Sequence, residues 1–308
     1  MSKLQKFFIG VLGVLLVLVI GVTAVGAKIY FDVKGSMDDT FETVERKETG
    51  VTRKKKVDLN KKDSFSILLL GVDTGDLGRT DTGRSDAIMV ATVSPEDNKT
   101  QIVSIPRDTY MEIVGYGTTD KINHAYAFGG PAMSMDSLEK YLGIPIDHYA
   151  AINMRGIKDL VDAVGGVTVN NDLAFTNEGV SFDIGQIRLT GDEALAFVRM
   201  RYDDPRGDYG RQERQRMVVE GITKQLISLS GVTQYQSILD AVSANMKTDM
   251  DFSMMQKIAL DYRAAFSNIK MDQLQGEGFM QDGVSYQRIA EEELERIQAE
   301  LKDQMNIR

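Results

Sequence analysis

The stretch SILLLGVDTGDLGRTDTGRSDAIMVATVSPEDNKTQIVSIPRD, residues 66–108, decides the fold. It contains three short apolar runs, which are SILLLGV, AIMVATV (Ala87–Val93) and TQIVSI (Thr100–Ile105). Apolar runs of this length, bounded by polar turn residues, are typical of buried β-strands. The polar linker SPEDNK between the last two runs predicts a hairpin turn. We therefore expect three neighbouring strands that form a meander.

Charged residues lie at the ends of these expected strands. Asp73 follows the first strand, and Arg84 and Asp86 lie at the start of the second. Arg107 follows the third strand. In a meander, these three ends meet at the same edge of the sheet. The sequence therefore predicts two carboxylates and two arginines at one rim.

Outward from this stretch, strands alternate with helices along the chain. HYAAIN and VTVN read as further strands, and Thr190 with Glu193 forms a capping box that starts a helix at Gly191. Alternation of this kind predicts an α/β fold, a three-layer α/β/α sandwich around a mixed central sheet. The remaining expected helices cover Gly130–Leu142, Arg155–Val164, Gly210–Leu229, and residues near 233–246, 252–266 and 287–304.

A second charged segment, RMRYDDPRGDYGRQERQR, spans Arg199–Arg216 and contains six arginines. Arg199 and Arg201 are two residues apart, so they point the same way only if the chain there is extended. We therefore expect the preceding helix to end near Val198.

The next helix places Arg211 and Gln215 four residues apart, on the same face as the apolar Val218 and Ile222. That face should point inward, with Arg214 close to it. A buried guanidinium needs a counter-charge. Two alternatives are open: a bound polyanion such as pyrophosphate, which arginine forks bind well, or ion pairs with the local carboxylates Asp203, Asp204, Asp208 and Glu213.

Composition limits the chemistry to oxygen ligands. The chain has no Cys and only two His, His124 and His148, so thiolate and multi-histidine metal sites are excluded. Asp73 and Asp86 are the expected ligands of a hard cation such as Mg²⁺. The alternatives are that Asp73 caps a turn and that Asp86 pairs with Arg84 or Arg107. Lys121 either reaches a phosphate or is solvated, and both His are expected to be structural.

The amino terminus predicts a membrane anchor. Residues 7–27, FFIGVLGVLLVLVIGVTAVGA, form an uncharged run long enough to span a bilayer. Lys3 and Lys6 precede this run and favour an N-in orientation. The alternative is a cleaved signal peptide that ends at Ala27. We expect a cytoplasmic tail over residues 1–6, a polar extracytoplasmic stalk over 28–62, a catalytic domain over 63–304 and a short tail over 305–308. The net charge of −9 argues against nucleic acid as a partner.

Six stretches resemble the LytR–CpsA–Psr family, in order from about Ile67 to Ile227. They are ILLLGVDTGDLGRTDTGRSDAIMVATV, VSIPRDTYMEI, DKINHAYAFGG, LVDAVGGVTV, LTGDEALAFVRMR and GDYGRQERQR. The resemblance implies a single-pass membrane phosphotransferase. It would move a glycopolymer, such as teichoic acid or capsular polysaccharide, from an undecaprenyl-pyrophosphate carrier to peptidoglycan and release undecaprenyl phosphate.

The resemblance also implies roles for individual residues. Asp73 and Asp86 match metal-associated carboxylates that use Mg²⁺, with Mn²⁺ as an alternative. Arg107, Asp86 and Asp208 are the candidate catalytic residues. The residues that match a pyrophosphate-binding set are Arg84, Arg107, Lys121, Arg199, Arg201, Arg211 and Gln215. Two other functions share these residues or the family name: a polyprenyl-pyrophosphate pyrophosphatase, and a non-enzymatic envelope regulator.

Overall fold

The computed structural model describes residues 27–46, 53, 56–73, 83–228, 235–262 and 264–307. Except for Ala27, the expected membrane anchor at 7–27 lies outside these residues. Within the described part of the chain, no helix has both the length and the apolar character needed to cross a bilayer. The chain divides into two compact units. The first unit comprises Met1–Thr40 and Met154–Met246, and the second comprises Phe41–Asn153 and Lys247–Arg308.

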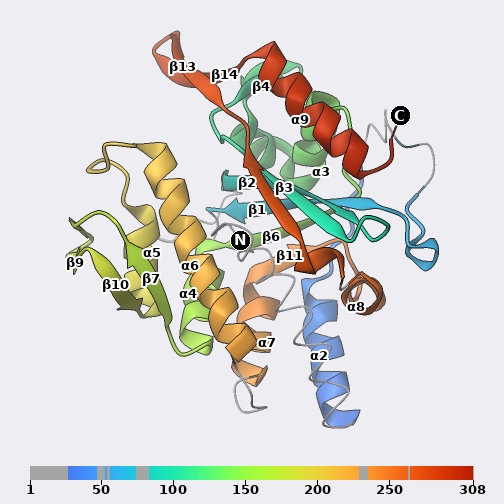
Figure 1. Ribbon diagram of the computed structural model, residues 1–308, viewed down its shortest axis with the longest axis horizontal. Helices are drawn as coiled ribbons and strands as arrows, with labels where there is room; N and C mark the ends of the chain where they lie inside the picture. Colours follow the sequence, from blue (N-terminus) through green and yellow to red (C-terminus); the bar gives the residue numbers. More distant parts are fainter. Residues whose placement is uncertain are drawn as a thin grey trace. The chain divides into compact units, whose positions relative to one another are not determined.

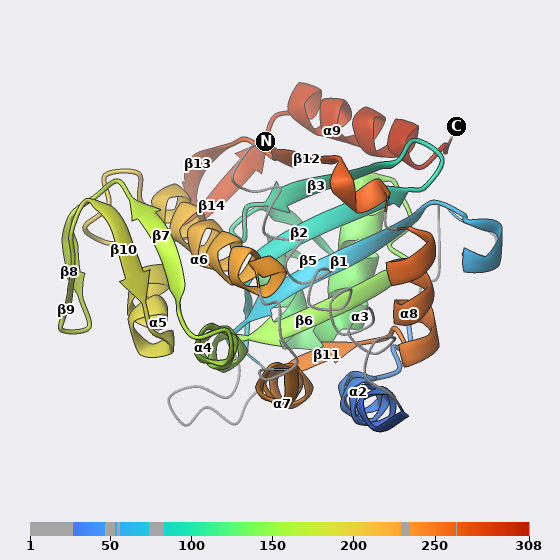
Figure 2. The ribbon, with the colours of Figure 1, turned by 60° about the horizontal axis from the view of Figure 1, so that its bottom comes forward.

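The second unit contains a six-stranded mixed sheet in the order β11-β6-β1-β2-β3-β12, which Figure 2 shows side by side. β1 pairs antiparallel with β2 and β2 pairs antiparallel with β3, which confirms the expected meander. β6 pairs parallel with β1, and β12 pairs parallel with β3. The strands are β1 (Phe65–Val72), β2 (Ser85–Ser94), β3 (Lys99–Ile105), β6 (His148–Asn153), β11 (Met246–Thr248) and β12 (Ile269–Gln273).

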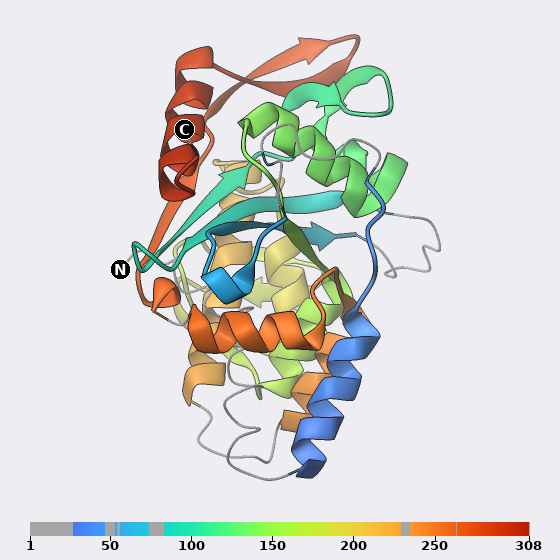
Figure 3. The ribbon, with the colours of Figure 1, turned by 90° about the vertical axis from the view of Figure 1, so that its right-hand side faces the viewer.

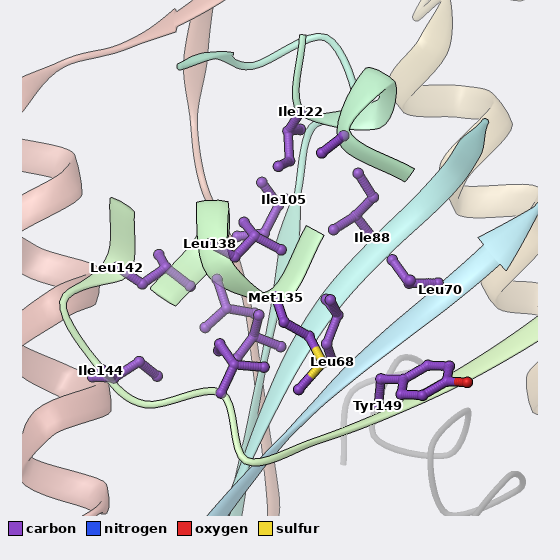
Figure 4. Packing of buried hydrophobic residues seen from close by; sticks show 14 of the residues in the cluster. Leu68, Leu70, Ile88, Ile105, Ile122, Met135, Leu138, Leu142, Ile144 and Tyr149 are labelled. Atoms are coloured by element: carbon purple, nitrogen blue, oxygen red, sulfur yellow. The ribbon is translucent and has the colours of Figure 1, made fainter. Parts of the chain in front are cut away.

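Helices cover both faces of this sheet within the second unit (Figure 3). One face carries Leu68, Leu70 and Ile88, which pack against α3 (Ile122–Leu142) and α9 (Glu291–Gln304) in one apolar cluster, shown in Figure 4. The opposite face carries Phe65, whose ring contacts Tyr262 at the end of α8 (Phe252–Asp261). Successive side chains of a β-strand point to opposite faces of the sheet. A strand whose side chains are mostly apolar must therefore be buried by other elements on both faces.

Two hairpins flank the rim of the sheet. β4 (Tyr110–Ile113) pairs with β5 (Thr118–Lys121), and β13 (Gly276–Gln281) pairs with β14 (Val284–Ile289). A parallel bridge between Thr109 and Gln287 joins the two hairpins, and Figure 1 shows β13 and β14 extending past β4. The second unit also contains the short helices η1 (Leu59–Lys61) and η2 (Ala265–Ser267).

The first unit is built from helices and two small sheets. α6 (Asp208–Ser228) packs on β7 (Val167–Asn171), which pairs antiparallel with β10 (Gly185–Leu189). The β8–β9 hairpin, Phe175–Asn177 with Val180–Phe182, packs its phenylalanines against Phe197. The remaining helices are α2 (Ala27–Thr40), α4 (Met154–Ala163), α5 (Gly191–Arg199) and α7 (Tyr235–Asn245).

Within the expected stalk, α2 packs on α7 and buries Val33 and Met37. Two sequence-based expectations about secondary structure were wrong. α3 begins at Ile122 rather than at Gly130, where the glycines Gly129 and Gly130 produce a kink inside the helix. The expected helix over 287–304 is strand β14 followed by α9, and strands β4, β5 and β12 to β14 were not predicted.

Candidate active site

The end of β1, the start of β2 and the end of β3 lie at one edge of the sheet, as the meander predicts. Val72 pairs with Ser85, and Ile88 pairs with Ile105. The backbone N–H of Asp73 donates to the carbonyl of Arg84 at 2.9 Å. The Arg107 guanidinium donates to the Asp86 carboxylate at 2.6 Å, and both side chains are largely buried.

The Asp86–Arg107 pair is the alternative that sequence reasoning left open for Asp86. This ion pair does not prevent substrate binding, because an arginine that is paired with a carboxylate still has N–H donors that can bind a phosphate. Arg84 is exposed at the same edge.

Asp108 links Arg107 to Lys121. One carboxylate oxygen of Asp108 lies 2.9 Å from the Lys121 ammonium, and the other lies 3.8 Å from Arg107 Nε. Asp108 was not among the predicted site residues, although its position directly after Arg107 could have indicated that it lies at the site. The backbone around this acid is held by α3 and β14, since Asn123 N–H donates to the Arg107 carbonyl and Gln287 N–H to the Asp108 carbonyl. Lys121 therefore lies beside Arg107 and not in bulk water.

The first unit carries the arginine-rich segment. α5 ends at Arg199, and Met200 has an extended backbone with φ −58° and ψ 129°, so the predicted end of this helix is confirmed. Met200 is buried, while Arg199 and Arg201 are partly exposed. Arg199 lies 3.4 Å from Glu178 in the β8–β9 turn, and Arg201 Nε lies 3.7 Å from Asp208.

Arg211 and Gln215 are both buried on α6, as the spacing predicts. Arg211 forms an ion pair with Asp208, the first residue of the helix, at 2.7 Å. Asp208 is thus shared by Arg201 and Arg211. One carboxylate between two guanidiniums leaves positive charge on this set, which suits a phosphate-bearing ligand.

Arg214 belongs to a different arrangement. It is fully buried, donates to Asp204 and to the Met200 carbonyl at 2.5 Å, and stacks over Phe175. Asp204 also accepts from Arg206. Burial opposes ionisation of Asp204, but the hydrogen bonds from Arg206 and Arg214 lower its pKa to about 2. The alternative of pairing with local carboxylates is therefore observed for Arg206 and Arg214 with Asp204, as it is for Arg201 and Arg211 with Asp208.

Both histidines pair with aspartates in the second unit. His124 Nδ1 lies 2.7 Å from Asp120, and His148 Nδ1 lies 3.1 Å from Asp249. Burial raises the pKa of Asp120, but the hydrogen bonds from His124 and from the Lys121 N–H outweigh it, and the net shift is downward.

Across residues 27–46, 53, 56–73, 83–228, 235–262 and 264–307, no group of three His, Cys, Asp or Glu could hold a metal ion. Asp73 and Asp86 supply two carboxylates on adjacent strands. Mg²⁺ commonly takes one or two protein carboxylates and completes its shell with substrate phosphates and water. The donor set therefore fits a cation that is held jointly with a phosphorylated substrate.

Comparisons with known proteins identify the family of the chain and its fold. The model of the LytR_cpsA_psr family matches residues 29–303. A polyisoprenyl-teichoic acid–peptidoglycan teichoic acid transferase TagU of Enterococcus faecalis is 59% identical over 306 residues, which cover 99% of each chain. The crystal structure of B. subtilis TagU has a TM-score of 0.60 at 41% identity and covers 79% of this chain and 97% of that chain. A structure of TagT bound to LI-WTA has a TM-score of 0.67 at 28% identity and covers 86% of this chain and 100% of that one.

The mixed α/β fold is thus shared with solved structures of related proteins. The chain belongs to the LytR_cpsA_psr family. It is a transferase.

Proposed function

We propose that this chain transfers a glycopolymer from a polyprenyl-pyrophosphate carrier to peptidoglycan. The observation that carries the proposal is the Arg107 set at the sheet edge, where the guanidinium forms ion pairs with Asp86 and Asp108, and Asp108 also pairs with Lys121. The relatives named as teichoic acid transferases support the same reaction. Teichoic acid is the polymer that their names specify, and capsular polysaccharide is the alternative.

The proposed step is a phosphoryl transfer. An acceptor hydroxyl oxygen attacks the phosphorus that bears the glycan, and the bond from that phosphorus to the bridging oxygen breaks. Polyprenyl phosphate leaves, and the product is a phosphodiester. Negative charge accumulates on the phosphate oxygens, so fixed guanidinium and ammonium groups accelerate the reaction.

Each unit is proposed to contribute its own set of phosphate-binding residues. In the second unit, Arg84, Arg107 and Lys121 bind phosphate oxygens. In the first unit, Arg199, Arg201, Arg211 and Gln215 do the same. Asp86 or Asp208 accepts the proton of the acceptor hydroxyl.

Asp73 and Asp86 would hold Mg²⁺, or Mn²⁺, together with the pyrophosphate. Bound there, the cation would supply a Lewis acid that neutralises the leaving phosphate. We further propose that residues 7–27 anchor the chain in the membrane, N-in, with the catalytic domain outside the cytoplasm. This anchor keeps the enzyme where its lipid carrier is confined.

A coupling assay tests the proposal. The full chain in detergent is mixed with a pyrophosphate-linked disaccharide on a short prenyl chain, peptidoglycan oligosaccharide and Mg²⁺. Transfer predicts a covalent glycan–peptidoglycan product that depends on Arg107 and is lost with chelator. Release of glycan phosphate to water, with no coupled product, would instead identify a pyrophosphatase.

A further inference from the structure

A pair of exposed aromatic rings lies in the second unit, one from the turn of the β4–β5 hairpin and one from α3. Tyr116 and Phe128 stack with their ring centroids 4.0 Å apart and an interplanar angle of 12°. Even so, Tyr116 is 54% exposed and Phe128 39% exposed. We call these two residues the aromatic platform. Large apolar side chains grouped in the open commonly mark a binding surface.

Tyr116 is held in place by the backbone of its turn. It lies between Gly115 and Gly117, whose φ angles of +80° and +77° favour glycine. The Tyr116 N–H donates to the Ile113 carbonyl, and Ile113 pairs with Thr118 at the end of the hairpin. The stack covers one face of the Tyr116 ring. The high exposure of this residue means that its other face is open to solvent.

Hydrogen bonds and ring contacts connect the aromatic platform to the phosphate-binding lysine. His124 lies 5.7 Å from Phe128, ring to ring, and its Nδ1 contacts Asp120. Asp120 precedes Lys121 and accepts a hydrogen bond from the Lys121 backbone N–H at 2.8 Å. Lys121 lies over the Tyr286 ring at 5.5 Å.

β5 runs from Thr118 to Lys121, three residue steps of about 3.3 Å each. Strand geometry therefore separates the start of β5, next to the Tyr116 turn, from Lys121 by about 10 Å. A ligand with phosphate at one end and sugar rings beyond it matches this order of groups.

We propose that the aromatic platform binds a pyranose ring of a glycan whose phosphate, or whose acceptor hydroxyl, lies at the Arg107 set. The apolar C–H face of the sugar stacks on the open face of Tyr116. His124 Nε2 lies on the side of the imidazole away from Asp120 and hydrogen bonds a sugar hydroxyl. This inference rests on the proposed function, because it names the glycan subsite of the same reaction.

The absence of tryptophan from the sequence provides a direct test of binding. Tyr116→Trp keeps an aromatic face and adds the only indole of the chain. Peptidoglycan tetrasaccharide and the short-prenyl pyrophosphate disaccharide are titrated separately against the full chain in detergent, followed by indole emission. A saturable change with the first identifies the acceptor glycan, and one with the second identifies the donor glycan; either supports the proposal.

Matched controls make this titration decisive. Phe31→Trp places the indole at another exposed aromatic position, on α2 in the first unit, and should not respond to either sugar. Inorganic pyrophosphate should leave the emission of Tyr116→Trp unchanged. The proposal is overturned if neither glycan changes that emission, or if pyrophosphate alone reproduces the change.

Kinetics give a second test. Tyr116→Ala should raise the KM for the glycan that binds there about tenfold, which corresponds to ~1.4 kcal/mol, whereas Tyr116→Phe should stay within about twofold. Because the ring is exposed, the melting temperature should stay within a few degrees. Normal KM in Tyr116→Ala would refute the aromatic platform and leave the transferase intact. Conversely, if the wild type couples no glycan but the indole still responds to sugar, the proposed function fails and the aromatic platform stands.

Discussion

The arginine-rich segment of the first unit and the sheet edge of the second unit hold their positive charges in different ways. In the first unit, Asp204 is buried and accepts hydrogen bonds from Arg206 and Arg214, so its negative charge is offset by two local arginines. At the sheet edge, Asp108 is shared between Lys121 at 2.9 Å and Arg107 at the longer distance of 3.8 Å. A buried arginine therefore indicates scaffold when its carboxylate is closed to water, as Asp204 is, and a ligand site when its carboxylate keeps access to water, as Asp86 and Asp108 do.

The largest expected effect is on the free energy of unfolding, and it concerns the buried arginine of the Asp204 cluster in the first unit. Arg214→Met removes a fully buried guanidinium and should lower the free energy of unfolding by about 3–5 kcal/mol. Chemical denaturation of the purified variant measures this change. Arg206→Ala is the matched control, because Arg206 binds the same carboxylate but is partly exposed, and should cost less than about 1 kcal/mol. Equal losses in the two variants would contradict the distinction.

The next effect should appear in activity. Arg107→Ala should lower the rate of glycan transfer by about two to three orders of magnitude, because it removes a donor that stabilises charge in the transition state. Stability should change less than in Arg214→Met, since both Arg107 and Asp86 keep some access to water. Lys140→Ala, which removes an exposed cation paired with Glu112 in the same unit, should retain normal activity. A normal rate of glycan transfer by Arg107→Ala would show that Arg107 is not part of the active site.

A third effect depends on pH. The pKa of Asp204 is lowered to about 2 in the folded chain, against the ordinary value of 3.8. The carboxylate therefore contributes stability that is complete above about pH 5, roughly 2 kcal/mol, and is lost as the pH falls through 3.8 toward 2. The wild type should exceed Asp204→Asn in unfolding free energy at pH 7, and the difference should shrink on acidification. If the difference in unfolding free energy between the two proteins grew as the pH fell, this prediction would be contradicted.

The smallest effect concerns Glu178, which lies near Arg199 at 3.4 Å with both side chains partly exposed. Exposed ion pairs contribute little, so Glu178→Gln should change the unfolding free energy by less than about 1 kcal/mol. If Arg199 binds substrate phosphate, releasing it from Glu178 should lower the KM for donor a few-fold. An increase in KM would show that Glu178 positions Arg199 for binding.

The strands at the centre of the second unit could be read from the sequence because their signal is local. Leu68 to Leu70 and Ala87 to Ala91 are apolar in every position, and the turn between β2 and β3 is polar. The same holds for the end of α5, where the spacing of Arg199 and Arg201 required an extended chain. The hairpins β4–β5 and β13–β14 were missed because their residues are half exposed and gain stability from each other rather than from a continuous apolar run.

The sequence by itself determined the mixed α/β fold, the family, and the positions of Asp86, Arg107, Arg211 and Gln215 on their elements, because hydrophobic periodicity and motif spacing are properties of the chain alone. Only the tertiary structure decided which carboxylate each cation contacts. Asp108 lies beside Lys121 through the pairing of Tyr110 with Lys121, and Arg214 is buried against Asp204 ten residues away. The stack of Tyr116 on Phe128 is of the same kind. Such contacts form only where packing brings separate segments together, and no local pattern in the sequence encodes the distance between those segments.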